Sequence, residues 1–476
     1  MPHFVLAAAD AANPYWPFVV LGIGILFVVI AIGVFRIHAF ISLMLAAVLV
    51  GCFASDLPVE EGSNQMVTAI KMSMANFGAT AGGIAWVIGL AAIIGVCLME
   101  SGAADRIVRG MVRALGEKRA GPALVICSFF LSVPVFFDTV FFLLIPLAQA
   151  LAMRIGKKYM YFVMAVCSGG AVTHGLVPPT PGPLAMAEEL GLDLGFTIIA
   201  GVAMGLIPAF SGLYFGKIMD AKMPMQVRET PGMKIADIEA IVNKKDDELP
   251  SFFVSALPVV LPVFLIAFFS FLEIWVSDGA FYHTAMVLGE KNVAMMIGTA
   301  IALGLLAKQK GLKISSLGNI MEGPLGTAGV IILITAAGGA FGKMINAAGI
   351  GDAIKHASAG TGVSLILVSW LVAAVLKVAQ GSGTVSMMTT VGIMAAVIGA
   401  DASAIDYSPF YILAAIAFGS QMGSWMNDSG FWVVCKMSGF TEKETLRTWT
   451  VLLAFMGLVG LIEVLIVSTI LPNLFM

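Results

Sequence analysis

Long apolar stretches recur along almost the whole chain. Clear examples are residues 18–35, 37–54, 82–99 and 445–471. A helix needs about 20 predominantly apolar residues to cross the hydrocarbon core of a bilayer, and roughly ten segments of this kind are present. The pattern predicts an all-α polytopic membrane protein whose first span begins near Phe18.

The charged residues between these stretches orient the chain. Basic residues gather at 106–119, 154–158, 217–245, 308–313 and 436–447, whereas the segments 55–62, 188–193, 273–278 and 401–406 are acidic or poor in basic residues. Lysine and arginine are enriched in short cytoplasmic loops. We therefore expect the first set inside, the second set outside, and both termini outside.

Two apolar segments are predicted to enter the membrane and return on the same side. Arg119 and Arg154 are both expected in the cytoplasm, although the residues between them are almost all apolar. Pro134 interrupts this segment, because proline removes a helical hydrogen bond and clashes with the preceding turn. Residues 121–153 are thus a predicted re-entrant hairpin. Residues 361–399 contain two interrupting glycines and predict a second hairpin, entering from outside.

An internal repeat relates the two halves of the chain. A shift of 247 residues, without gaps, superposes 80–82 on 327–329, the first hairpin turn (132–138) on the second (379–385), and 173–183 on 420–430. Because loops that are basic in the first copy are basic-poor in the second, the halves have opposite predicted topology. The inverted repeats are residues 18–220, with a broken helix at 158–190, and residues 251–474, with a broken helix at 408–436. A cytoplasmic linker, 221–250, joins them.

The four interruptions predict where a ligand binds. A helix that begins inside the membrane exposes unpaired N–H groups and about half a positive charge, which suits an anion. Irregular backbone at membrane depth is tolerated only where it is buried or lines a cavity. We therefore expect all four breaks to face one site near the midplane.

Composition excludes several other classes of protein. The chain is 59% hydrophobic and 12% charged, with a mean hydropathy of +0.98, which is too apolar for a soluble domain. A net charge of −3 argues against nucleic-acid binding. The five cysteines lie in apolar segments without paired spacing, so neither disulfides nor a zinc site is expected. The first 17 residues lack the basic region of a cleaved signal peptide.

The broken stretches resemble one known family, the gluconate permeases or gluconate:proton symporters. The matching motifs are Val133-Pro134-Val135-Phe136-Phe137-Asp138, Thr173-His174-Gly175, Pro178-Pro179-Thr180-Pro181-Gly182-Pro183, Ala379-Gln380-Gly381-Ser382 and Asn427-Asp428-Ser429-Gly430-Phe431-Trp432. The likeness spans nearly the whole chain. It implies a bacterial inner-membrane protein of the ion transporter superfamily, a homodimer with a scaffold and an elevator-type transport domain, and proton-coupled uptake of gluconate or a related sugar acid.

Two positions depart from that family pattern. Gluconate-type members carry histidine where this chain has Thr180 and Trp425. The bulk of Trp425 suggests a shorter hydroxy acid, while Thr180 keeps only a hydroxyl for hydrogen bonding.

Three residues are candidates to carry protons. Asp138 and Asp428 lie beside breaks at membrane depth, where an ionised carboxylate is costly. Each has an alternative role as a helix N-cap. His174 is expected either to relay protons near neutral pH or to hydrogen-bond a carbonyl freed by the neighbouring prolines.

The candidate substrate site is polar and contains one cation. Lys377 lies one turn before Gly381, deep in an apolar segment, so it attracts the substrate carboxylate, pairs with Asp138 or Asp428, or extends along the hairpin to the surface. Neutral groups at the breaks suit a polyol or satisfy the interrupted backbone. The remaining predicted substrate-binding residues are Thr173, His174, Thr180, Gly182, Gln380, Gly381, Ser382, Gly383, Thr384, Gln421, Ser424, Asn427 and Ser429.

Rival functions differ in what they require. An intramembrane enzyme needs a nucleophile–base pair or metal-ligand spacing, and no such motif is present. A channel needs no duplicated hairpins. Sodium is the alternative coupling ion to the proton, because Ser382 and Thr384 at a hairpin tip offer oxygen ligands for it. No other cofactor is expected.

Overall fold

The structure is a computed structural model that describes residues 15–55, 57–58, 64–116, 119–229, 248–273, 286–349, 353, 364–398 and 405–474. These residues form helices and connecting segments without any strand. Eight helices are long and apolar enough to cross a membrane. The prediction of an all-α polytopic membrane protein is confirmed. Most of the predicted linker, at 230–247, lies outside the described residues.

The described residues of the first half form ten helical elements. They are α1 (Trp16–Val29), the π-helix η1 (Ile30–Val34), α2 (Ala39–Phe53), α3 (Gln65–Glu100), α4 (Ala103–Leu115), α5 (Ala120–Leu131), α6 (Phe137–Ile155), α7 (Tyr159–Leu176), α8 (Pro181–Glu189) and α9 (Leu194–Lys222). Local chemistry sets several ends. The side chains of Asn64 and Asp193 accept hydrogen bonds from the first turns of α3 and α9. Gly156, at φ 73°, terminates α6.

The described part of the second half also consists of helices. Its elements are α11 (Phe252–Glu273), α13 (Lys291–Lys310), α14 (Ile314–Ala347), α16 (Leu365–Gln380), α17 (Gly383–Ile398), α18 (Phe410–Gly419), α19 (Ser429–Met437), α20 (Glu442–Thr445), the π-helix η5 (Leu446–Thr450) and α21 (Val451–Ile470). From α8 to α19, and from α9 to the α20–α21 segment, both the starts and the ends are offset by 248 residues: 181 to 429, 189 to 437, 194 to 442 and 222 to 470.

The helices are interrupted at all four predicted stretches. The gaps lie between α5 and α6, between α7 and α8, at 381–382 between α16 and α17, and between α18 and α19. One predicted span needs correction, because residues 82–99 are only the C-terminal half of the 36-residue helix α3. Polar residues such as Thr68 and Ser73 lower the hydropathy of its N-terminal half, yet they are buried by packing.

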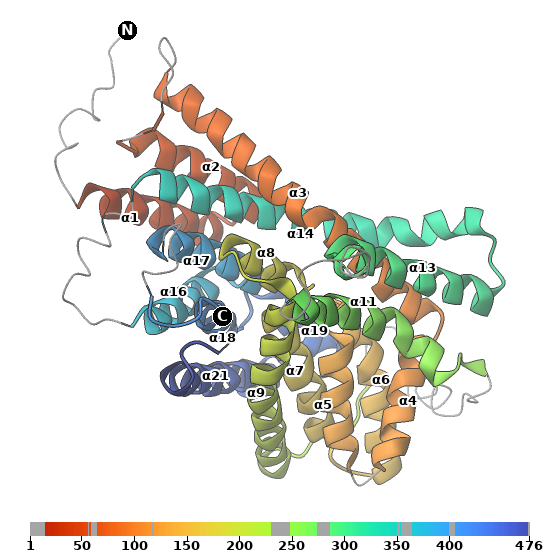
Figure 1. Ribbon diagram of the computed structural model, residues 1–476. Helices are drawn as coiled ribbons and strands as arrows, with labels where there is room; N and C mark the ends of the chain where they lie inside the picture. The colour runs from red at the N-terminus through yellow and green to blue at the C-terminus, as the bar shows by residue number, and fades with distance from the viewer. Residues whose placement is uncertain are drawn as a thin grey trace.

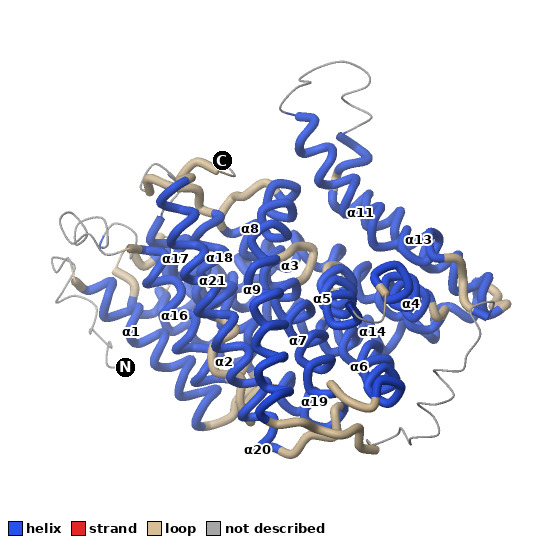
Figure 2. Tube along the Cα trace, turned by 90° about the horizontal axis from the view of Figure 1, so that it is seen from below, coloured by secondary structure: helices blue, strands red, loops and turns tan. Residues whose placement is uncertain are grey.

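Long helices α3 and α14 pack against each other, and α2 and α17 pack on α14 (Figure 1). Helices α11 and α13 lie side by side and extend away from the broken helices, as Figures 1 and 2 show. Small residues permit the closest approach between α14 and α17. A Cβ on Gly342 would lie 2.3 Å from the Cα of Gly392, so neither position accepts a side chain.

Candidate functional site

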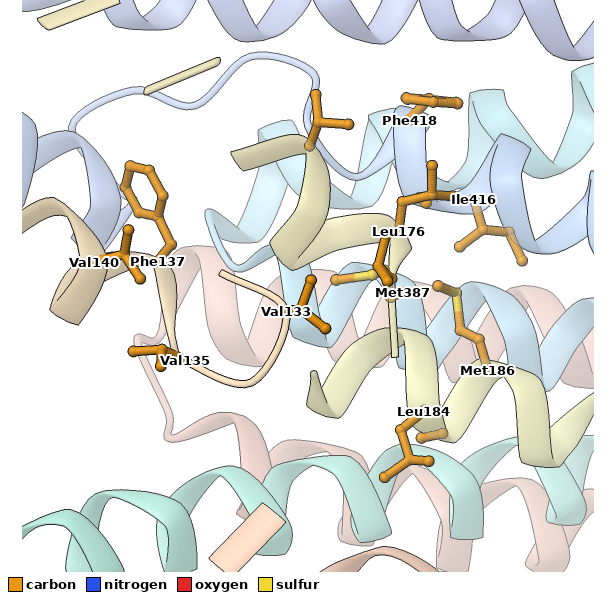
Figure 3. Packing of buried hydrophobic residues seen from close by; sticks show 14 of the residues in the cluster. Val133, Val135, Phe137, Val140, Leu176, Leu184, Met186, Met387, Ile416 and Phe418 are labelled. Carbon is orange, nitrogen blue, oxygen red and sulfur yellow. The ribbon is translucent and has the colours of Figure 1, made fainter. Parts of the chain in front are cut away.

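The four breaks pack against one another. In the first half, the ring of Phe136 lies edge-on to His174 with centroids 6.4 Å apart. In the second half, a Cβ on Gly381 would lie 2.3 Å from the carbonyl oxygen of Asn427. Apolar side chains from the breaks and adjoining helices, among them Val133, Leu176 and Met387, belong to the buried core (Figure 3). The folded chain thus gathers the interrupted segments in one place.

Direct contacts also join the two halves at the breaks. The Nε2 of Gln421 donates to the carbonyl of Ala171 across 3.4 Å. Gly182 lies so close to α17 that a Cβ there would be 2.7 Å from the Cε of Met387. The first broken helix therefore contacts both the second broken helix and the second hairpin.

Lys377 and Asp428 form a buried ion pair at the centre of this region. The Nζ of Lys377 donates to the Oδ2 of Asp428 across 2.7 Å and to the carbonyl of Gly381 across 2.6 Å. The two residues are only 4% and 9% exposed. Lys377 thus pairs with one of its two predicted partners. The alternative that it extends to the surface is wrong, because the hairpin tip is packed against the 427–428 segment.

Asp428 combines both of its predicted environments. Its Oδ1 accepts from the N–H of Gly430 across 3.0 Å, so it caps α19. Its Oδ2 also accepts from the Oγ of Ser424. The charge is therefore held by three donors, which is what a buried carboxylate requires.

Trp449 supports this pair, and sequence reasoning missed it. Its Nε1 donates to the Oγ of Ser424 across 2.7 Å, and its ring stacks on Phe137 with centroids 5.2 Å apart. Thr450 donates to the carbonyl of Ser424. Both residues lie in the π-helix η5, a local irregularity that residue spacing does not reveal. The only hint in the sequence was that Trp449 and Thr450, which can both donate hydrogen bonds, stand at the start of the last apolar span.

Asp138 occupies a different position from the predicted cap. The N-cap of α6 is Phe136, and Asp138 is the second residue of the helix, so the capping alternative is wrong. The side chain is half-buried and makes no hydrogen bond within the described part of the chain. The charge of Asp428 acts on it through space. A carboxylate in a first helical turn is favoured by the helix dipole, while a second carboxylate nearby opposes it.

His174 lies in the last turn of α7. Its buried Nδ1 has no hydrogen-bond partner among the described residues, so the alternative in which the ring bonds a proline-freed carbonyl is not supported. The peptide bond between Pro178 and Pro179 is cis, and the ring faces Phe136 instead. The Oγ1 of Thr173 and the Oε1 of Gln421 also lack partners. Unsatisfied polar atoms of this kind are available to a bound hydroxyl group.

Other predicted site residues complete the interrupted backbone. Thr180 donates to the carbonyl of Val177 across 2.6 Å, and Asn427 and Trp425 both donate to the carbonyl of Val378 across 3.0 Å. The Oγ of Ser382 accepts from the N–H of Val385 across 3.3 Å.

Three more predicted residues lie at or near the hairpin tip and the last break. Ser429 is exposed, and Thr384 has no side-chain hydrogen bond to a described residue. A Cβ on Gly383 would lie 3.5 Å from the carbonyl oxygen of Ser420. The side chain of Gln380 lies outside the described residues.

A polar cavity of about 270 Å³ adjoins the far end of α8. It is lined in part by Thr80, Glu188, Glu189 and Lys343. The Nζ of Lys343 lies 3.4 Å from the Oε1 of Glu189, and Glu188 pairs with Lys291 of α13. These contacts join α8 to the long helices α3, α13 and α14. They lie apart from the Lys377–Asp428 pair.

Comparison with known proteins gives a consistent result. A family model described as GntP family permease matches residues 16–470. A gluconate permease of Pseudomonas aeruginosa is 32% identical over 444 residues, covering 92% of this chain and 94% of that protein. The Gnt-II system L-idonate transporter of Escherichia coli is 31% identical over 461 residues, covering 96% and 100%.

The fold also matches a solved structure. The YdaH transporter of Alcanivorax borkumensis has a TM-score of 0.59 and 14% sequence identity, covering 96% of this chain and 98% of that one. At this identity the likeness concerns the fold alone.

Proposed function

Since this chain belongs to the GntP permease family and is therefore a multi-pass membrane transporter, not an enzyme, we propose that it takes up a sugar acid or a shorter hydroxy acid together with protons. The observation that carries the proposal is the buried Lys377–Asp428 pair at the meeting point of the breaks. Relatives named for gluconate and L-idonate support the substrate class.

The site suits a small hydroxylated anion. Two of the three N–H donors of Lys377 are used by Asp428 and Gly381, so one remains for a substrate carboxylate. The first turn of α17 begins beside this lysine and presents helical N–H groups. The unpartnered atoms of Thr173, His174 and Gln421 would bind substrate hydroxyls.

The two departures from the gluconate pattern favour a different acid from gluconate itself. The Thr180 hydroxyl is already used by the carbonyl of Val177, and the indole N–H of Trp425 is used by Val378. Neither position therefore offers the free donor that a histidine ring would. The bulky indole, 43% exposed, also reduces the space for a long polyol.

Proton coupling is assigned to Asp138 together with Asp428. Asp138 has no bonded cation within the described residues, and the carboxylate of Asp428 acts on it, so Asp138 is suited to gaining and losing a proton. Sodium is the alternative ion, bound by oxygens of Ser382 and Thr384.

The transport motion is proposed to follow from two inverted repeats with both termini outside. The matching order and offset of the helices support the repeat. Helices α3 and α14 belong to the scaffold of a homodimer, and the hairpins with the broken helices form the moving elevator domain. The cavity between α8 and α3 lies on the boundary between them.

Uptake into proteoliposomes tests the proposal. Labelled gluconate and labelled three- and four-carbon hydroxy acids are offered with a pH gradient or a sodium gradient imposed separately. We expect accumulation of the shorter acid driven by the pH gradient, and a shift toward gluconate in Thr180→His/Trp425→His. Accumulation driven by a sodium gradient alone would rule out proton coupling. Exclusive transport of gluconate by the unmodified protein would rule out a shorter hydroxy acid as the substrate.

A further inference from the structure

Three charged side chains are buried in the described part of the chain, and one of them is alone. They are Lys377, Asp428 and Glu463, which are 4%, 9% and 9% exposed. The first two pair with each other. The Oε2 of Glu463 is buried without a hydrogen-bond partner, and no ion pair with a described residue reaches this carboxyl group. An ionised carboxylate in that setting is strongly disfavoured.

Glu463 lies well inside a membrane-spanning helix. It is the one ionisable residue of α21, an apolar helix that ends at Ile470. Seven residues at 1.5 Å per residue place it about 10 Å from that end. The sequence signal was a single acidic residue within the last apolar stretch.

Helix α21, which carries Glu463, is hydrogen-bonded to α16 and α18, two helices that contribute to the Lys377–Asp428 region. The Nε1 of Trp370 in α16 donates to the carbonyl of Gly457 across 3.1 Å. The hydroxyl of Tyr411 in α18 donates to the carbonyl of Leu471 across 2.6 Å. Helix α21 is therefore hydrogen-bonded to both the second hairpin and the second broken helix.

Packing alone does not require a carboxyl group at this place. With the offset of 248 residues between α9 and the α20–α21 segment, Glu463 aligns with Phe215 of the first half. Phe215 stacks on Phe455 of α21 with centroids 5.7 Å apart. The corresponding position in the other half is thus an apolar packing residue.

No neighbouring charge explains the carboxyl group. Helices α7, α9, α16 and α18 and the π-helix η5 pack on α21. Their charged or readily titrated side chains are His174 of α7, Lys377 of α16, Arg447 of η5, and Lys217, Asp220 and Lys222 in the last two turns of α9. Lys377 is held by Asp428, and the described contacts place none of these groups on Glu463. The phenol of Tyr411 on α18 is held by Leu471.

We propose that Glu463 is a second proton-binding site of the transporter, protonated in this arrangement and ionised when the movement of α21 exposes it to water. The inference rests on the proposed proton coupling. A carboxyl group that binds a proton on one side of the membrane, keeps it while buried and releases it to water on the other side carries that proton across. Protonation also removes the charge that the apolar surroundings oppose.

Glu463→Gln tests the site, because the amide has nearly the same shape and never ionises. We expect substrate counterflow within about twofold of the unmodified protein and a loss of at least about tenfold in accumulation driven by a pH gradient, which corresponds to roughly 1.4 kcal/mol. Glu463→Asp should retain gradient-driven accumulation. Glu442→Gln, at a side chain that is 47% exposed, serves as the control and should leave transport unchanged.

The outcomes separate this inference from the proposed function. Normal gradient-driven accumulation by Glu463→Gln, or an equal loss in the Gln and Asp variants, would overturn the site. If the unmodified protein shows no response to a pH gradient, the proposed coupling itself fails. If Asp138→Asn uncouples transport but Glu463→Gln does not, only this inference falls.

A second measurement uses the unmodified protein. Dicyclohexylcarbodiimide reacts with protonated carboxyl groups in apolar surroundings, and mass spectrometry locates the adduct. Labelling of Glu463 that declines as pH rises is expected, with substrate altering its rate. Absence of label at Glu463 across the whole pH range would overturn the proposal even if the glutamine variant did not assemble.

Discussion

Removing Lys377 should destabilise the protein and weaken substrate binding together. Lys377→Met removes the donor that lies 2.7 Å from Asp428 and 2.6 Å from the carbonyl of Gly381. Asp428 then keeps only Ser424 and the N–H of Gly430. Removing one partner of a buried ion pair costs about 3–5 kcal/mol, because the other charge stays uncompensated.

A double-mutant cycle isolates the pair. Adding Asp428→Asn to Lys377→Met removes the uncompensated charge while keeping a group that can bond Ser424. We expect the double variant to be more stable than the sum of the single effects by about 2 kcal/mol or more. Thermal unfolding in detergent measures stability, and calorimetry measures the dissociation constant for the substrate, which should rise at least about tenfold in Lys377→Met.

The control is an exposed lysine–glutamate pair. Lys310 pairs with Glu100, but both side chains are over 40% exposed, so Lys310→Met should cost no more than about 1 kcal/mol. Additive effects of Lys377→Met and Asp428→Asn would refute the reasoning. So would a dissociation constant unchanged by Lys377→Met.

Three further changes follow from the same geometry. Asp138→Asn should abolish accumulation driven by a pH gradient while leaving counterflow intact, and normal accumulation would remove the proton role of Asp138. Gly381→Ala should abolish transport, because φ is +83° and the new Cβ would lie 2.3 Å from the carbonyl oxygen of Asn427. The control is Gly311→Ala, at φ +64° in open space, which should lower the free energy of unfolding by only about 1 kcal/mol. Equal losses of transport in the two variants would contradict the importance of the close contact at Gly381. Lys291→Glu places two carboxylates together at the end of α8 and should slow uptake. Glu188→Lys/Lys291→Glu reverses the pair and should restore the uptake rate. A double variant as slow as Lys291→Glu would show that uptake does not depend on this ion pair.

The sequence predicted the features that depend on local chemistry. Pro134 and Gly381 interrupt helices through their own backbone restrictions, so the places where these helices break were readable from the chain. The alternation of long apolar stretches with charged loops likewise predicted a membrane protein, because the bilayer fixes the length of a spanning helix.

Other features depended on residues distant in the chain. The choice of Asp428 as the partner of Lys377 joins residues 51 positions apart. The bond from Trp449 to Ser424 joins residues 25 positions apart. The stacking of Trp449 on Phe137 needs the first and second halves to be packed together.

The roles of Asp138 and Glu463 show the same division. Sequence spacing offered Asp138 as a helix N-cap. In the structure the N-cap is Phe136, two residues before Asp138, because the chain leaves the turn there. Glu463 carried little weight in the sequence, because one acidic residue hardly changes the hydropathy of a long apolar helix. Its isolation became visible only when the neighbouring helices were in place, since burial and the absence of a partner are properties of packing and not of composition.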